Sequence, residues 1–217
     1  MRMKNERVPI QARTLTPFYY HGLYARDGSA THPNVITDTS LMFALKYALL
    51  PDVSPALRAK PDYRADLLQI PWRASLLWGS ENAMMPPIRH TIDVEREGGN
   101  HENMQKNMGS GNFKKTFFVH EVTTGARYHG LLMGPNPFKL LNLEKTETFV
   151  IRVGVGKLGL LEISQLEEDE LEVVYLNTAT AKLFKRHLKE AYRILDTIRV
   201  SQPLSIKEAK NELRHWV

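Results

Sequence analysis

A glycine-rich turn between two apolar runs constrains the fold of this chain most strongly. Residues 148–163 read TFVIRVGVGKLGLLEI, with three glycines at the G-x-G-x-x-G spacing of dinucleotide sites: Gly154, Gly156 and Gly159. In such a site the loop opens a helix whose N-terminus meets a phosphate. Here residues 158–163 have the composition of a strand, and the acidic stretch 165–172 follows. The pattern therefore predicts a tight turn between two strands.

Two cations flank this turn, Arg152 and Lys157. Because glycines let a backbone approach a ligand closely, we predict that the two cations, with Gly154 and Gly156, contact a phosphate backbone. The alternative is a plain hairpin with a solvated lysine. A Walker A loop is excluded, because Leu158 replaces the hydroxyl residue that must follow the lysine.

Composition indicates one sizeable core and a mild preference for polyanions. The 217 residues are 42% hydrophobic and carry 29 Lys plus Arg against 24 Asp plus Glu, a net charge of +5. The absence of cysteine excludes disulfides and thiol catalysis. No apolar run reaches membrane-spanning length and no signal-peptide pattern opens the chain. We expect a cytoplasmic protein with no membrane partner.

Hydrophobic periodicity and turn residues predict an α+β fold. Strands are expected at 8–20, 73–78, 88–94, 113–122, 127–133, 148–153, 158–163 and 171–176. Helices are expected at 41–50, 179–200 and 205–217, with one short helix within 51–71. Residues 97–112, rich in Gly and Asn, cannot form a core and predict the mobile tip of a long β-hairpin.

Aromatic and basic residues alternate in two places, as in readers of single-stranded RNA. Phe18 is expected in the core. The other members are the predicted RNA contacts Arg13, Tyr19, Tyr20, His21, Arg26, Lys114, Lys115, Arg127, Tyr128 and His129.

None of the eight histidines has H-x-x-x-H spacing, so no metal or other cofactor is expected. His21 and His129, each beside tyrosine, are the best candidates for general acid–base cleavage of RNA. The alternative is that they only bind RNA.

Three segments together resemble one known family: TPFYYHG at 16–22, TSLMFALKYAL at 39–49, and TFVIRVGVGK at 148–157. The chain is similar to the RAMP proteins of type I CRISPR Cascade complexes, in the short variant of the fifth Cas family. The resemblance spans residues 8–176. It implies an RRM-like (ferredoxin-like) domain over 1–176, with the hairpin inserted at 97–112, and a C-terminal helical extension over 177–217.

The resemblance also implies a function. The protein would hold the 5′ handle of the crRNA without catalysis, cap the backbone-subunit filament, contact the large subunit, and lie near target DNA at the PAM. One lineage of the family cleaves precursor crRNA, so a metal-independent endoribonuclease is the first alternative. A small nucleotide-binding enzyme that uses residues 154–159 is the second.

Overall fold

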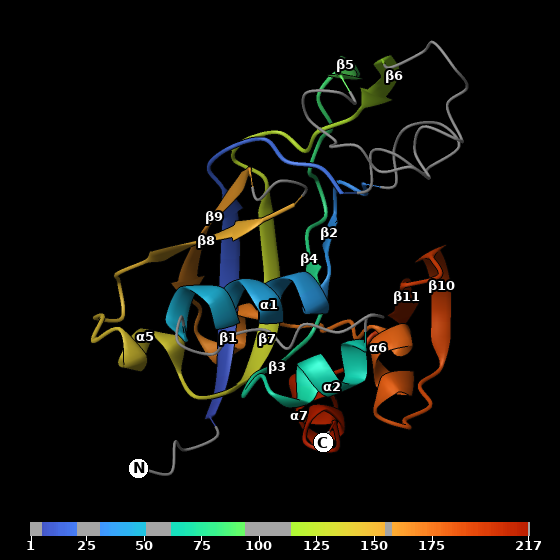
Figure 1. The fold of residues 1–217 in the computed structure, drawn as a ribbon. Coiled ribbons are helices and arrows are strands. Elements are labelled where there is room, and N and C mark those ends of the chain that lie inside the picture. Colours follow the sequence, from blue (N-terminus) through green and yellow to red (C-terminus); the bar gives the residue numbers. More distant parts are fainter. Residues whose placement is uncertain (1–5, 21–30, 51–61, 94–113, 155–157, 217) are drawn as a thin grey trace.

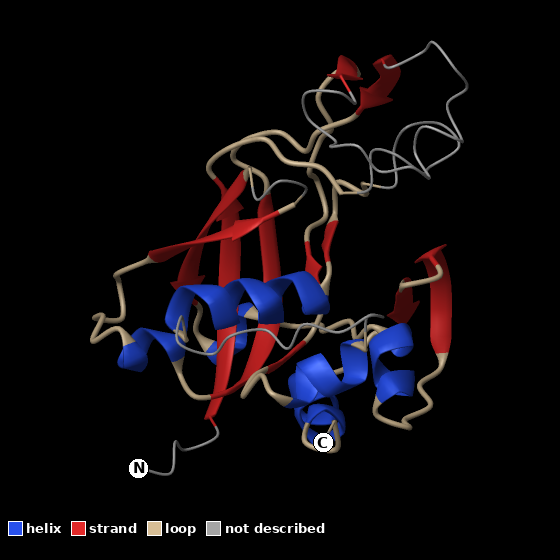
Figure 2. Ribbon diagram, in the orientation of Figure 1, coloured by secondary structure: helices blue, strands red, loops and turns tan. Residues whose placement is uncertain are grey.

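An antiparallel sheet of seven strands organises the chain. The structure, a computed structural model, describes residues 6–20, 31–50, 62–93, 114–154 and 158–216 (Figure 1). The strand order is β2-β4-β7-β1-β9-β8, and β3 also pairs with β7. Figure 2 shows the sheet curling, with α1 lying across one face. The fold therefore mixes α and β elements around a curled antiparallel sheet.

The strands of this sheet are β1 (Glu6–Thr14), β2 (Val35–Ile36), β3 (Arg73–Ala74), β4 (Leu77–Trp78), β7 (Arg127–Gly134), β8 (Phe149–Val153) and β9 (Gly159–Gln165). Two smaller sheets pair β5 (Ile88–Asp93) with β6 (Lys114–Val119), and β10 (Glu190–Leu195) with β11 (Ile198–Ser201). The helices are α1 (Asp38–Leu49), α2 (Tyr63–Leu68), α5 (Pro137–Leu140), α6 (Thr178–Leu183) and α7 (Ile206–Leu213), with a 3₁₀ turn at Glu168–Glu170. Within the described ranges, no helix has both the length and the apolar character needed to cross a bilayer.

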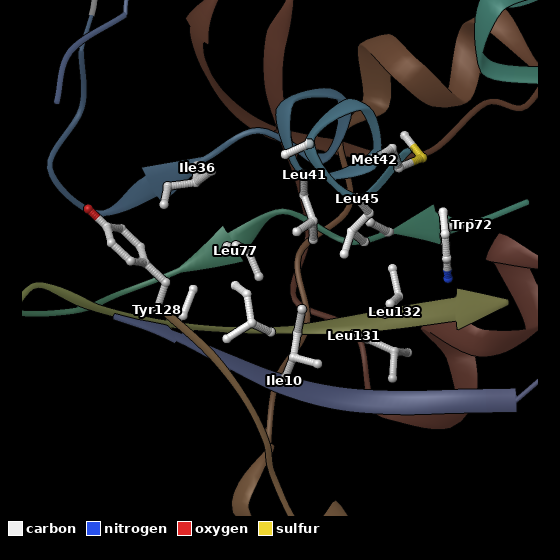
Figure 3. Close-up of a cluster of buried hydrophobic side chains, with 14 of the residues drawn as sticks. Ile10, Ile36, Leu41, Met42, Leu45, Trp72, Leu77, Tyr128, Leu131 and Leu132 are labelled. Atoms are coloured by element: carbon white, nitrogen blue, oxygen red, sulfur yellow. The ribbon is translucent and has the colours of Figure 1, made fainter. Parts of the chain in front are cut away.

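Helix α1 begins where its capping residue predicts. The Thr37 hydroxyl accepts a hydrogen bond from the backbone N–H of Ser40 at 3.2 Å, which satisfies one of the free donors of the first turn. Leu41 and Leu45 are fully buried and point at the sheet, above Leu77 and Leu132 (Figure 3). The predicted helix at 41–50 is confirmed, and its apolar side faces the main core.

Strand β1 shows the predicted alternation. Val8, Ile10 and Ala12 are buried. The strand ends at Thr14, however, and not at residue 20. Beyond it, Phe18 rejoins the body through a single β-bridge with Val122. The extension of this strand over 15–20 is therefore wrong.

The long helix predicted over 179–200 is also wrong. Helix α6 ends at Leu183, and Lys185 adopts the left-handed conformation with φ 59°. The N–H groups of Lys185 and Arg186 bond to the carbonyls of Lys182 and Ala181. These two bonds are a Schellman ending, which glycine usually supplies. The rest of the predicted helix forms the β10–β11 hairpin.

The predicted strand at 171–176 is absent as well. Isolated bridges, Val174 to Leu204 and Asn177 to Val200, and a hydrogen bond from the Ser201 N–H to the Leu176 carbonyl tie this segment to the chain that follows. Leu171, Val174 and Leu176 are nevertheless buried in the main core. Helix α7 matches the predicted C-terminal helix, with a capping box in which Ser205 and Glu208 bond each other's backbone. Trp216, just beyond α7, is fully buried in the same core.

The predicted hairpin is confirmed in its strands. β5 and β6 pair in register from Ile88 with Val119 to Asp93 with Lys114. Figure 1 shows this ribbon standing away from the main sheet. The predicted tip at 97–112 lies outside the described residues.

Candidate nucleic-acid interface

The face of the sheet opposite α1 gathers polar side chains from its two central strands. On β1, Gln11 and Arg13 alternate with the buried Ile10 and Ala12, so they point to the other face. In the β1–β7 register Gln11 lies opposite His129 and Arg13 opposite Arg127. Residues directly opposite each other in an antiparallel pair share a face. Four residues that are distant in sequence therefore form one group.

Strands β9 and β8 extend this group. In the β1–β9 pair, Arg13 lies opposite Glu162. In the β8–β9 pair, Arg152 lies opposite Leu160. By the same alternation, Arg152 faces the side that Arg13 faces, since Ile151 and Val153 are buried beneath it. We call these residues the outer-face cluster: Gln11, Arg13, Arg127, His129, Arg152 and Glu162.

The cluster holds more positive than negative charge. Arg13 Nε lies 2.9 Å from Glu162 Oε2, and both side chains are partly exposed. Within the described residues, the guanidinium groups of Arg127 and Arg152 make no hydrogen bond or ion pair. Three arginines thus face one carboxylate. Like charges directly opposite on neighbouring strands destabilise a sheet, and Glu162 pairs with only one of the two arginines that lie opposite each other, Arg13.

A turn that precedes the β5–β6 hairpin holds the backbone of Arg127 in place. The side-chain carbonyl of Asn82 accepts from the Arg127 N–H, and the Asn82 amide donates to the Arg127 carbonyl, both at 2.9 Å. Asn82 can approach because Gly79 has no Cβ, which would lie 2.4 Å from the Arg127 carbonyl oxygen. The side chain of Asn82 thus pairs with Arg127 as a neighbouring strand would, and it holds that residue in register.

His129 is a partly buried, hydrogen-bonded side chain in this setting. Its Nε2 lies 3.1 Å from Gln11 Oε1, so Nε2 carries the proton and donates. Partial burial lowers the pKa of His129; Arg127 lowers it further, and Glu170 acts in the opposite direction. Gln11 cannot exchange protons, so this pair lacks the second acid–base group that cleavage of RNA requires.

The tyrosines chosen from the sequence lie elsewhere. Tyr128 is fully buried on the α1 face, and its hydroxyl donates to the Pro33 carbonyl at 2.6 Å (Figure 3). Tyr20 packs edge-on against Phe18, with ring centroids 5.3 Å apart, and burial raises its pKa. Tyr19 is half-buried, and desolvation raises its pKa too. Tyr128 offers no open ring face to a base, and the hydroxyl of Tyr20 is buried.

A different aromatic group borders the outer-face cluster. Trp78 of β4 lies opposite His129 in the register, so it shares the outer face. Its ring centroid lies 4.5 Å from that of Tyr175 and 6.1 Å from that of Tyr192, which is 41% exposed. These residues come from three separate segments, and no spacing in the sequence joins them. Sequence reasoning missed this group.

The glycine turn is explained by packing. β8 and β9 are antiparallel neighbours, which confirms the predicted turn between strands. Gly154 has φ +81°, and a Cβ on Gly159 would lie 2.6 Å from the Cβ of Phe18. Gly154 and Gly159 therefore allow the segment around Phe18 to pack closely against the β8–β9 hairpin. Because this loop opens a strand, it lacks the helix N-terminus of a dinucleotide site.

Several predicted contacts cannot be placed on this face. His21, Arg26, Gly156 and Lys157 lie outside the described residues. For Lys114 and Lys115, the backbone belongs to β6, at the distal end of the β5–β6 ribbon. Arg13, Arg127, His129 and Arg152 are the predicted contacts that the structure brings together.

No set of three His, Asp or Glu side chains comes together in the described part of the chain in a way that could hold a metal ion. No protein-family model matches the chain, and no curated protein matches it.

Proposed function

We propose that this protein binds single-stranded RNA across the outer-face cluster, as a crRNA-binding subunit of a type I CRISPR effector complex. The observation that carries the proposal is the Arg13–Arg127 pair, two cations directly opposite each other on an exposed sheet face. One carboxylate, Glu162, offsets only part of this charge. A phosphate between the two guanidinium groups would remove their repulsion and form charge-assisted hydrogen bonds with both.

Single-stranded RNA suits this surface better than a duplex does. A chain of phosphates can follow the cations from Arg127 through Arg13 toward Arg152, which lie on successive strands. Tyr192 and Trp78 border the same face and could receive an unstacked base. Cationic grooves with neighbouring aromatic side chains are typical of proteins that bind single strands.

The strand order supports an RRM-like, ferredoxin-like core for this proposal. Strands β4, β7, β1 and β9 lie side by side in that order, and each neighbour pair is antiparallel. With α1 between β1 and β4, this is the order of a split βαβ unit. The cluster then occupies the two central strands on the face without α1, where RRM domains stack bases.

Two features depart from that pattern. In its described part, the connection from β7 to β9 contains the four-residue helix α5 and the extra strand β8 and no further helix or strand. The outward residues of β1 and β7 include arginine, glutamine and histidine where an RRM domain carries aromatic rings. We infer that phosphate contacts contribute more to binding here than base stacking does. The β5–β6 ribbon, inserted between β4 and β7, would act as a thumb against the neighbouring backbone subunit, and the large subunit would join the same assembly.

The test is the salt dependence of RNA binding by fluorescence anisotropy. The probe is a labelled single-stranded, repeat-derived RNA. It is titrated with the protein at several salt concentrations. Loss of two phosphate contacts in Arg13→Ala/Arg127→Ala should lower the slope of log K against log salt by about 1.4, from about 0.7 per contact on single strands. Glu162→Gln should strengthen binding, because it releases Arg13.

Arg64→Ala/Lys207→Ala is the matched control. It removes the same charge from two exposed positions on α2 and α7, away from the cluster. If this control changes the slope as much as the cluster variant does, binding follows net charge alone and the proposed interface is wrong.

A further inference from the structure

The outer edge of β8 is a free edge of the main sheet. β8 is the last strand in the order and pairs only with β9 among the described strands. The Leu160 N–H bonds to the Thr16 hydroxyl, and the Leu160 carbonyl accepts from the Leu15 N–H. The backbone N–H and C=O groups of Leu160 therefore point toward β1, and those of its neighbour Leu161 point toward β8.

This alternation fixes which groups of β8 point outward. Ile151 lies opposite Leu161, so its backbone groups face β9. The backbone N–H and C=O groups of Val150 and Arg152 then point away from the sheet. No described residue makes a backbone hydrogen bond with them. Val150 is also 48% exposed, so the edge can be reached from solvent.

A groove of about 900 Å³ runs along this edge. Residues 150–154 line it on one side, and side chains of α1, among them Phe43, Tyr47 and Ala48, line it on the other. The hollow continues past α1 to Tyr63 of α2 and to residues of α6 and the 196–198 segment. Figure 1 shows β8 lying beside α1. Tyr47 is 46% exposed. An apolar channel thus lies next to backbone donors and acceptors with which no described residue pairs.

We propose that this edge and groove receive an extended peptide segment of a partner protein, which pairs with β8 as an added strand. Donors and acceptors that recur at every second residue are matched by another extended chain. Exposed edge strands are normally protected by proline, by bulges or by several charges. Residues 149–153 read FVIRV, with no proline and one charge, and the β8–β9 register is unbroken.

The surroundings of β8 on the two faces of the sheet determine which side chains the added peptide should carry. Side chains that an added strand directs to the α1 side would meet Phe43, Ala44 and Tyr47, so they should be apolar. Side chains on the opposite face would lie beside Arg152, whose guanidinium has no partner within the described residues. An acidic residue fits there. The expected pattern is apolar, acidic, apolar at successive positions. This inference does not depend on the RNA proposal.

The probe is a capped, fluorescein-labelled peptide, Ser-Thr-Val-Glu-Val-Thr-Ser, titrated by anisotropy with the full-length chain. Val150→Pro removes the outward N–H and breaks no bond to β9, since proline is tolerated on edge strands when its nitrogen faces solvent. It should weaken binding by about tenfold, through the lost hydrogen bond and the altered edge. Val150→Thr, which keeps the N–H, should bind as the unaltered chain does.

Two further measurements do not rely on the proline variant. A probe with N-methyl groups on both valines and on the glutamate lacks the central backbone donors in either strand direction and should not bind. Arg152→Glu should reverse the preference between the glutamate probe and the same peptide with lysine in its place. Equal binding of both probes by both proteins would overturn the proposal, as would no saturable binding of the glutamate probe. Dimerisation of the free chain that Val150→Pro abolishes would assign the edge to a second copy and would also overturn it.

Discussion

Stability should fall as the pH rises through the range in which Asp38 ionises. Asp38 is the first residue of α1 and is fully buried. One of its oxygens accepts from the side-chain amide of Asn177, the capping residue of α6, at 3.0 Å. Burial raises the pKa of Asp38 to about 6, and the hydrogen bond from Asn177 offsets this only in part. In the unfolded chain the same carboxyl has its ordinary pKa of 3.8.

The sign follows from the two pKa values. Between them the folded protein holds a proton that the unfolded chain has released, so raising the pH favours unfolding. The penalty is absent below the unfolded pKa and complete above the folded one. A difference of about two pKa units corresponds to about 3 kcal/mol of unfolding free energy, as an upper estimate.

Asp38→Asn tests this reasoning. The amide keeps an acceptor for Asn177 but cannot ionise. Urea denaturation at pH 4 and pH 8 gives the unfolding free energy of both proteins. The stability of the variant relative to the unaltered chain should increase by about 2–3 kcal/mol between the two pH values. Taking the difference between pH values removes any constant loss of packing or hydrogen bonding.

Asp169→Asn, on the exposed 3₁₀ turn, is the control, and its relative stability should change by less than about 0.5 kcal/mol. If Asp38→Asn behaves like this control, Asp38 does not carry a raised pKa in the folded protein, and the reasoning is refuted.

Three further predictions concern the loops and the histidine. Arg152→Ala/Lys157→Ala should lower the salt slope of RNA binding by about 1.4, and an unchanged slope would rule out phosphate contact at the glycine turn. Lys185→Gly should raise the free energy of unfolding by about 0.5–1 kcal/mol, because glycine adopts the left-handed conformation without strain; a loss of stability would contradict the Schellman ending. The purified chain should not cleave the repeat-derived RNA probe in EDTA; a discrete product lost in His129→Ala would make the protein an endoribonuclease.

Elements whose start or turn is decided by residues that are close in the chain were predictable from the sequence. Helix α1 has a threonine cap and an apolar face, and α7 has a complete capping box. The glycine turn between β8 and β9 follows from glycines between a β-branched run and a second apolar run. In each case, the residues that decide the structure are neighbours in the chain.

The region after Leu183 was not predictable in the same way. A helical stripe continues through residues 184–198, yet the helix ends because Lys185 takes a conformation that its residue type disfavours. What decides the outcome is distant contact. Arg186 forms a two-bond ion pair with Glu212 of α7, and Phe184 stacks on Trp216 with ring centroids 5.7 Å apart. Neither partner can be identified from the local pattern.

The outer-face cluster shows how strand geometry divides a motif that looks uniform in the sequence. The sequence predicts that Arg127, Tyr128 and His129 together contact RNA, as a mixture of charge and stacking surface. Successive residues of a strand point to opposite faces, so the same alternation that exposes Arg127 and His129 buries Tyr128. That division could have been inferred from the predicted strand alone. The juxtaposition of Arg127 with Arg13 could not, because it depends on which strand lies beside β7 and in which register. A stacking surface, if RNA uses one here, must therefore come from another element, and Trp78 and Tyr192 are the aromatic residues that the fold brings to this face.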